Sequence, residues 1–247
     1  MRYEEFTIEG RNAVLEAFRA GKTIDRLFIL DGCKDGPVQT IVREARKGDT
    51  IITFVKKERL DQMSETGKHQ GVIAYAAAYE YAQVEDMLAL AREKGEDPFL
   101  FILDGIEDPH NLGSVIRVVE CAGATAVVIP NRRSAVVNET VVRVSAGATN
   151  YVPVCKVNNI NQAIEKLKQK GVWVFAADMD GEEMYNVNLK GDIALVIGAE
   201  GDGVGALTRK VCDGIISIPM SGKINSLNAS VSAGIVLYEA VRQRGKN

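Results

Sequence analysis

The last third of the chain, residues 193–241, carries the pattern that most constrains the fold. It contains two short apolar runs, 194–197 and 214–219, each of the length of a buried strand. Polar, glycine-rich loops follow them at 198–205 and 221–228. In an α/β sheet, ligands bind in the crevice beyond the carboxyl ends of the strands. We therefore expect these two loops to line one ligand crevice.

Further apolar runs alternate with amphipathic segments between residue 98 and this region. Strands that are apolar throughout and alternate with helices are typical of a largely parallel sheet covered on both faces. Asn111 is a candidate N-cap for one of the helices, because asparagine favours that position. The pattern predicts strands at 99–103, 126–129, 151–154 and 172–176 and helices at 112–121, 136–146 and 160–170.

The first part of the chain has the pattern of a smaller α/β unit. Residues 79–97 carry one further expected helix, 84–94, between polar ends, and we interpret them as a linker. The sequence thus predicts an N-terminal domain at 1–78, a linker at 79–97 and a C-terminal domain at 98–247. In the N-terminal domain we expect strands at 26–30, 51–55 and 71–76 and helices at 13–18, 38–47 and 56–63.

Composition narrows the class of protein. A net charge of −3 argues against a wholly basic nucleic-acid binder. The lysines and arginines of residues 1–78 are interleaved with acids, and form either a solvated surface or an RNA-facing patch. Four cysteines without a C-x-x-C pair and two histidines lead us to expect no disulfide and no metal site. The sequence shows no signal-peptide pattern and no run of about 18 apolar residues, so we expect a cytoplasmic protein without membrane contact.

Three stretches stand out as motifs: 108–117 (DPHNLGSVIR), 197–201 (IGAEG) and 218–230, which begins with IPM and ends with SLNAS. In this order they resemble the three motifs of the SpoU branch of the SPOUT RNA methyltransferases. Residues 9–14 and 68–72 are similar to the substrate-binding domain of one subgroup, which resembles an RNA-binding fold of ribosomal proteins. The subgroup that the chain resembles most is the bacterial 23S ribosomal RNA guanosine 2′-O-methyltransferases.

The resemblance implies properties that composition and periodicity do not give. The family is an α/β fold whose C-terminal segment is threaded through a loop to form a deep trefoil knot. It acts as a homodimer with the active site near the subunit interface, and its methyl donor is S-adenosylmethionine. Because only RNA has a ribose 2′-hydroxyl, the implied partner is structured RNA, with ribosomal RNA favoured, and DNA is excluded.

By the resemblance, Gly198, Ile218 and Leu227 bind the cofactor, through backbone groups and through apolar side chains around the adenosine. A glycine at 198 lets the backbone approach a ligand closely. The alternative is that it is a turn glycine after a strand. The spacing Gly201-x-Gly203-x-Gly205 differs from the G-x-G-x-x-G fingerprint, so we do not expect a nicotinamide dinucleotide site.

The resemblance also implies catalytic roles for five residues: Asn111, Arg117, Glu200, Ser226 and Asn228. Arg117 would act at the ribose, either by taking the hydroxyl proton or by binding phosphate bidentately. The second role is easier chemically, because the pKa of arginine lies above ~12. Each residue also has a structural interpretation: the asparagines and the serine as helix caps, Glu200 as a loop carboxylate, and Arg117 as a surface ion-pair partner.

With the resemblance, the sequence predicts methylation of a guanosine ribose in 23S ribosomal RNA. Two alternatives stay open: a transfer RNA substrate, and an RNA-binding ribosome-assembly factor that has lost activity. The presence of Asn111, Arg117, Glu200 and Asn228 together argues against the inactive factor.

Overall fold

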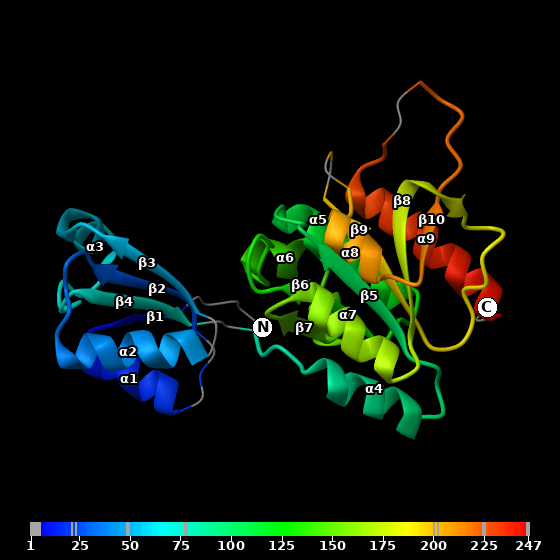
Figure 1. Cartoon of the computed structure of the whole chain (residues 1–247). Helices are drawn as coiled ribbons and strands as arrows, with labels where there is room; N and C mark the ends of the chain where they lie inside the picture. Colours follow the sequence, from blue (N-terminus) through cyan, green and yellow to red (C-terminus); the bar gives the residue numbers. More distant parts are fainter. Residues whose placement is uncertain are drawn as a thin grey trace. The chain divides into compact units, whose positions relative to one another are not determined.

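The chain folds into two compact units, Met1–Glu80 and Tyr81–Asn247, in a computed structural model (Figure 1). The structure describes residues 6–20, 22, 24–47, 50–76, 79–199, 201, 203–223 and 226–245. Each unit has its own sheet and its own hydrophobic core. The α/β character expected from the alternation of apolar and amphipathic segments is confirmed in both units.

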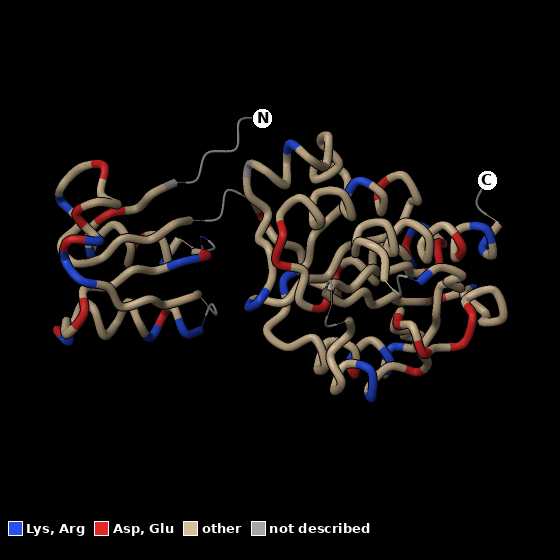
Figure 2. Tube along the Cα trace, turned by 90° about the horizontal axis from the view of Figure 1, so that it is seen from above, with Lys and Arg blue, Asp and Glu red and all other residues tan. Residues whose placement is uncertain are grey.

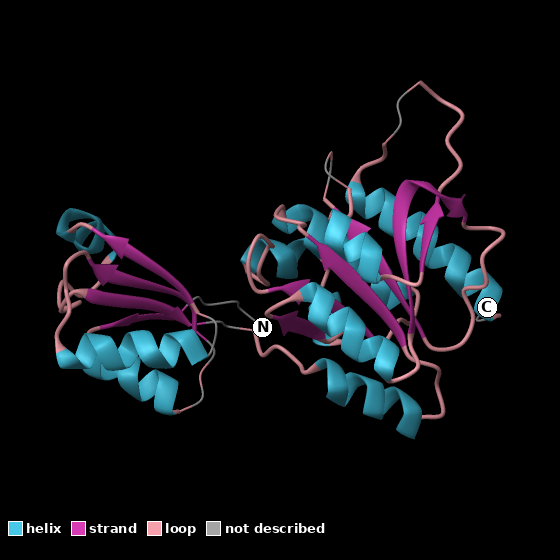
Figure 3. Ribbon diagram, viewed as in Figure 1, coloured by secondary structure: helices cyan, strands magenta, loops and turns pink. Residues whose placement is uncertain are grey.

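The first unit is a four-stranded sheet with the strand order β1-β4-β2-β3. Strands β2 and β3 are parallel and the other pairs are antiparallel. Helices α1 and α2 cover one face of the sheet (Figure 3), and their buried side chains share a core with those of β2 and β4. The elements are β1 (Phe6–Glu9), α1 (Arg11–Arg19), β2 (Ile24–Leu30), α2 (Gly36–Lys47), β3 (Ile51–Val55), α3 (Lys57–Met63) and β4 (Val72–Ala76).

Strand β1 is the element of this unit that the sequence pattern does not predict. Its four residues, FTIE, alternate between apolar and polar positions, but the run has only the minimum length of a strand signal. The strand forms because it pairs with β4 from Phe6 opposite Ala76 to Glu9 opposite Ile73, a partner far away in the sequence.

The second unit is built on a six-stranded sheet with the order β10-β8-β9-β5-β6-β7, in which every pair is parallel. The expected parallel sheet is therefore confirmed, and β9 lies in its interior with all six residues buried. The elements are α4 (Val84–Glu93), β5 (Phe99–Asp104), α5 (Pro109–Cys121), β6 (Ala126–Pro130), α6 (Glu139–Val144), η1 (Ala148–Asn150), β7 (Val154–Val157), α7 (Ile160–Gln169), β8 (Trp173–Glu183), β9 (Ile193–Gly198), α8 (Ala206–Val211), β10 (Gly214–Ser217) and α9 (Ala229–Arg244).

Helix α4 lies in the range 79–97 that the sequence suggests as a linker, and the structure assigns this helix to the second unit. Its buried Val84 and Leu88 pack in the same core as Leu100 of β5. The apolar stripe of the helix needs a surface to cover, and the second sheet provides it. The connection between the two units therefore lies before α4.

Helix α5 begins three residues earlier than its apolar pattern suggests, and the expectation that Asn111 caps it is wrong. Asp108 is the N-cap, since its carboxylate accepts a hydrogen bond from the backbone N–H of His110. Pro109 occupies the first helical position, where its fixed φ and missing N–H are tolerated. Asn111 therefore lies in the first turn, with its side chain available for another contact.

The segment expected to be helical at 136–146 forms a shorter helix, α6, followed by the 3₁₀ turn η1. Strand β7 lies at Val154–Val157, later than the expected 151–154. Among the described helices, none combines the length and the apolar character needed to cross a bilayer. The trefoil knot that the resemblance implies stays a prediction.

Gly113 tests the packing of α5 on α6. A Cβ atom at this position would lie 2.8 Å from the Cβ of Val144 and 3.0 Å from the carbonyl oxygen of Val141. We expect Gly113→Ala to lower the free energy of unfolding by about 1–3 kcal/mol, as overpacking does, measured by urea denaturation. Gly234→Ala is the matched control, because its Cβ would meet an ordinary contact, Val118 Cγ1 at 3.8 Å. Equal stabilities of the two variants would contradict this account.

Candidate functional site

The two loops that follow β9 and β10 line one cavity of about 290 Å³, as the sequence predicts. Small-molecule sites have volumes of roughly 300–1,000 Å³, so the cavity is at the lower end of that range. Among the described residues, its lining mixes backbone at glycines with apolar side chains and the carboxylate of Asp178. The lining residues are Ala177, Asp178, Met179, Ile197, Gly198, Ala199, Gly201, Gly203, Val204, Arg209, Ile218, Met220, Ser226, Leu227, Ala229 and Ser232.

The end of β9 can form this cavity because residue 198 is a glycine. A Cβ atom on Gly198 would lie 2.0 Å from the carbonyl carbon and oxygen of Gly203 and 2.3 Å from the nitrogen of Val204. The backbone N–H of Gly203 donates to the carbonyl of Ala199 at 3.0 Å, which closes the loop on itself. No other residue type fits at position 198 without moving the loop.

Carboxylates from the two strands beside β9 lie against this loop. The Oδ2 atom of Asp104, at the end of β5, accepts a hydrogen bond from the backbone N–H of Gly205 at 3.1 Å. Asp178, on β8, lies so close to Gly203 that a Cβ there would be 3.2 Å from its Oδ2. The loop is therefore bonded to β5 and packs closely against β8.

Asp178 and Arg209 are cavity-lining residues that the sequence analysis missed. The Arg209 guanidinium lies 3.3 Å from Asp178 and 2.5 Å from Asp180, which fixes both carboxylates. The hydrogen bond from Arg209 is the largest cause of the lowered pKa of Asp180. A signal was present, because Asp178 and Asp180 follow the apolar run at 172–176, and polar residues at the carboxyl ends of parallel strands are candidates for a site.

The structure brings together Asn111 and Asn228, two of the predicted catalytic residues. The Nδ2 of Asn228 donates to the Oδ1 of Asn111 at 3.0 Å. The other end of the Asn228 amide caps α9, accepting from Ser230 N at 2.9 Å, Ser230 Oγ at 2.6 Å and Val231 N at 3.3 Å. The expectation that Asn228 caps the last helix is thus confirmed, and both ends of its amide are fixed.

The remaining predicted site residues fall into three groups. Gly198, Ile218, Leu227 and Ser226 all line the cavity. Arg117 lies on the exposed side of α5, outside the cavity lining, and makes no hydrogen bond or ion pair within the described residues. Glu200 lies outside the described residues, and its catalytic role stays a prediction.

A second cluster of polar contacts lies in the first unit. It joins the stretches 9–14 and 68–72, on which the resemblance to a substrate-binding domain rests. Arg11 Nε donates to the carbonyl of Gln70 at 3.0 Å, and the N–H of Arg11 donates to its Oε1 at 3.3 Å. The guanidinium also pairs with Asp35 at 2.9 Å. Gln70 has a φ of 51°, a left-handed conformation that these bonds help to hold.

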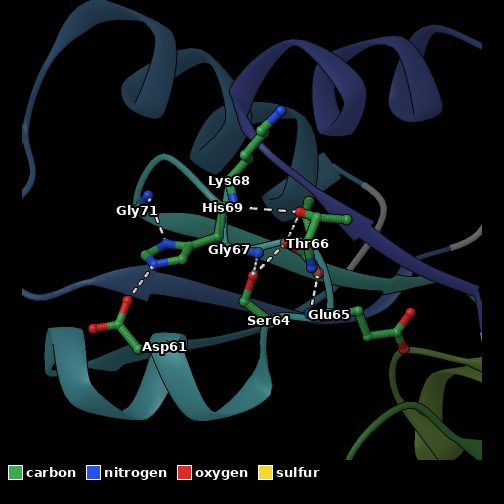
Figure 4. Close-up of polar contacts among 9 residues, drawn as sticks. Asp61, Ser64, Glu65, Thr66, Gly67, Lys68, His69 and Gly71 are labelled. Atoms are coloured by element: carbon green, nitrogen blue, oxygen red, sulfur yellow. Dashed lines mark hydrogen bonds and ion pairs between the residues drawn. The ribbon is translucent and has the colours of Figure 1, made fainter.

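The loop between α3 and β4 is fixed by side chains that replace regular backbone pairing (Figure 4). The Ser64 hydroxyl accepts from the N–H of Gly67 at 2.9 Å, and the Thr66 hydroxyl accepts from that of Lys68 at 3.2 Å. His69 Nδ1 accepts from the N–H of Gly71 at 3.0 Å, so its Nε2 carries the proton toward Asp61, 2.9 Å away. These contacts fix the backbone conformation of the loop.

Glu9 anchors this loop to β1. Its carboxylate accepts from the hydroxyls of Ser64 and Thr66, at 2.5 and 2.6 Å, and from the N–H groups of Glu65 and Thr66 at 2.6 and 3.2 Å. Burial alone would raise the pKa of Glu9, but the hydrogen bonds outweigh it and lower the pKa to about 2. A carboxylate held in this way stabilises the fold as long as it is ionised.

The folded pKa of Glu9, about 2, lies below its ordinary value of 4.5. Its contribution to stability is therefore present above pH 4.5 and is lost as the pH falls toward 2. We expect Glu9→Gln to lower the free energy of unfolding at neutral pH by on the order of 1 kcal/mol, because water screens this partly exposed group. Urea unfolding at a series of pH values should show the difference from wild type shrinking toward pH 2.

Glu65→Gln is the control for this experiment. It removes an equal charge from the loop that Glu9 holds, and the described contact of the Glu65 side chain is a long hydrogen bond that it accepts from Thr7, at 3.4 Å. A pH-independent difference for Glu9→Gln, or an equal effect of Glu65→Gln, would contradict the anchoring role of Glu9.

Comparison with protein families assigns both units. The profile of the SpoU rRNA Methylase family matches residues 98–238. The profile described as RNA 2′-O ribose methyltransferase substrate binding matches residues 7–82. The second match ends close to the boundary between the two compact units, after Glu80.

Individual relatives agree with these matches. The chain is 43% identical over 237 residues to YacO of Bacillus subtilis (strain 168), which is assigned to the TrmH family of tRNA/rRNA methyltransferases, covering 95% of this chain and 94% of the relative. A structure of an RNA 2′-O ribose methyltransferase is 26% identical, with a TM-score of 0.56, covering 97% of this chain and 88% of that one. The SpoU methyltransferase AviRb from Streptomyces viridochromogenes, solved with AdoMet, shares the fold at 23% identity and a TM-score of 0.62, covering 98% of this chain and 92% of that one.

Proposed function

The chain belongs to the SpoU family of RNA methyltransferases, and from this premise we propose that it transfers the methyl group of S-adenosylmethionine to the 2′-hydroxyl of a guanosine ribose in 23S ribosomal RNA. The observation that carries the proposal is the combination of two units in one chain. A unit of the substrate-binding type precedes a unit in which residues of the second and third motifs line one glycine-built cavity. Ribosomal RNA as substrate places the protein in the cytoplasm.

The cavity fits S-adenosylmethionine in its chemistry. Ile218 and Leu227 offer apolar surface to an adenine ring, and backbone at Gly198, Gly201 and Gly203 lines the cavity beside them. Asp178 offers a carboxylate that suits the positive charges of the donor. The cofactor supplies a methyl group on a positively charged sulfur, a good leaving group, so the protein needs to supply positioning more than chemical activation.

We assign Asn111 and Asn228 to positioning of the acceptor ribose. The hydrogen bond between them, at 3.0 Å, holds two amides at the N-terminal ends of α5 and α9. Asn228 follows the cavity-lining Ser226 and Leu227 directly in the sequence. A fixed amide next to the cofactor cavity is suited to orient a hydroxyl by hydrogen bonding.

We assign Arg117 to phosphate binding, because a guanidinium carries a positive charge and binds phosphate oxygens bidentately. Within one chain Arg117 is absent from the cavity lining. In a homodimer in which α5 of one subunit faces the cavity of the other, Arg117 of the first subunit would lie beside the cavity of the second. An exposed stripe on α9, with Val231 48% and Tyr238 50% exposed seven residues apart, offers apolar surface for such an interface.

We expect Arg117→Ala to reduce methyl transfer at least 100-fold, because electrostatic and positioning contacts of this kind contribute factors of 10²–10³, while S-adenosylmethionine binding is retained. The measurement is single-turnover methyl transfer together with calorimetric cofactor binding. Lys166→Ala, which removes an equal charge from a position 67% exposed on α7, should retain turnover. Turnover of Arg117→Ala close to wild type would contradict the assignment.

The proposed function is tested by incubating the protein with labelled S-adenosylmethionine and either protein-free ribosomal RNA or bulk transfer RNA, followed by digestion to nucleosides. The proposal predicts 2′-O-methylguanosine from ribosomal RNA. Label in transfer RNA alone would keep the chemistry and overturn the substrate. Absence of transfer to either RNA and to ribosomal particles, despite cofactor binding, would favour an assembly factor without activity.

A further inference from the structure

The first unit has an open groove of about 810 Å³ between α2 and the edge strand β3, away from the contacts of Figure 4. The floor is apolar and includes the buried Val38, the half-buried Val42 and the ring of Phe54. The remaining lining residues are Asp31, Gly32, Cys33, Lys34, Gln39, Arg43, Arg46 and Lys47. Four of these are cationic and one is acidic, although the chain as a whole has a net charge of −3.

Phe54 is the unusual feature of the groove. Its side chain is 54% exposed, on a strand at the edge of the sheet. The same backbone position pairs in register with the fully buried Ile29 of β2, so the strand that carries the ring is fixed by the sheet. An exposed aromatic ring on a rigid strand is suited to contact a flat partner, because little conformational entropy is lost on binding.

Three of the cations lie on one helix of the groove. Arg43, Arg46 and Lys47 are three and four residues apart on α2, so they share one side of the helix. Arg43 and Lys47 both contact Glu44, which lies outside the groove lining, and their side chains are 68% and 64% exposed. In the part of the chain that the structure describes, Arg46 makes no ion pair. Positive and negative residues are interleaved along the unit as a whole (Figure 2), so this excess is local.

We propose that this groove binds a single-stranded segment of the RNA substrate, with one base stacked on Phe54 and the flanking phosphates held by Arg43, Arg46 and Lys47. Stacking on an aromatic ring beside a row of cations is the usual arrangement in single-strand binding sites. Duplex RNA does not fit, because its bases are already stacked and present no free face to the ring. That the bound nucleic acid is RNA rests on the proposed function. The presence of the cationic groove with its exposed ring does not depend on it.

The test uses the full-length protein and a fluorescein-labelled oligouridine of about 12 nucleotides, with binding followed by fluorescence anisotropy. We expect Phe54→Ala to bind about 5- to 100-fold more weakly, the range that loss of one stacked base produces. Phe54→Trp should bind like wild type and Phe54→Leu should resemble the alanine variant, because leucine keeps apolar bulk without a π-face. Tyr185→Ala, which truncates a ring 56% exposed in the second unit, is the matched control and should bind like wild type.

The cations are tested by the salt dependence of the same binding. Arg46→Ala should reduce the slope of log affinity against log salt by about 1, the value for one lost phosphate contact. Arg19→Ala, an exposed arginine on α1 paired with Glu16 and outside the groove, should leave the slope unchanged. Cys33 provides an independent probe of occupancy, because this half-buried, free cysteine is one of the lining residues. Alkylation of Cys33, followed by mass spectrometry, should slow when the oligonucleotide is present in wild type but not in Phe54→Ala.

Several results would overturn the groove proposal. They are wild-type affinity of Phe54→Ala, an equal loss by Tyr185→Ala, or the same loss by Phe54→Ala for a preformed oligouridine–oligoadenosine duplex. Because binding is measured without methyl transfer, the two proposals fail separately. Loss of binding in Phe54→Ala supports the groove even if wild type methylates no RNA, and unchanged binding overturns it even if wild type methylates ribosomal RNA.

Discussion

The close approach of two backbone segments at the end of β9 is the constraint on which the candidate site depends. Gly198 lies against Gly203 and Val204 at distances that exclude any side chain. The strand itself is buried along its whole length between β8 and β5, so it cannot shift to relieve a clash. Asp104 from β5 bonds the loop through the N–H of Gly205, and Asp178 from β8 lies close against Gly203. The loop is thus enclosed by three adjacent parallel strands, and it forms a wall of the cavity.

Much of this arrangement could be predicted from the sequence, because its causes are local. An apolar run of strand length followed by a polar, glycine-rich loop specifies both a buried strand and a break at its end, which is why the crevice between 198–205 and 221–228 was predictable. The N-cap of α9 at Asn228 was predictable for the same reason. The start of α5 was mispredicted because the helix was placed from its apolar positions, which begin at Leu112. Asp108 and Pro109, which form the true start, are not part of that apolar pattern.

Features that depend on contacts distant in the sequence could not be predicted. Strand β1 forms only because β4 pairs with it, and α4 joins the second unit only because the sheet offers an apolar face. The contact between Asn111 and Asn228 joins residues 117 positions apart. Arg117 is the residue for which sequence and fold differ most. Its motif predicts a place in the active site, whereas the fold of one chain leaves it exposed and outside the cavity lining. A second subunit would resolve that separation.

We propose that the glycine-built loop after β9 forms the binding site for S-adenosylmethionine. Calorimetric titration of S-adenosylmethionine into wild type and into Gly198→Ala tests this, with circular dichroism to confirm that the variant is folded. We expect saturable binding to wild type and loss of binding in the folded variant, because the added methyl group would displace the loop from Gly203. Equal affinity of the two proteins, or no binding to wild type, would contradict it.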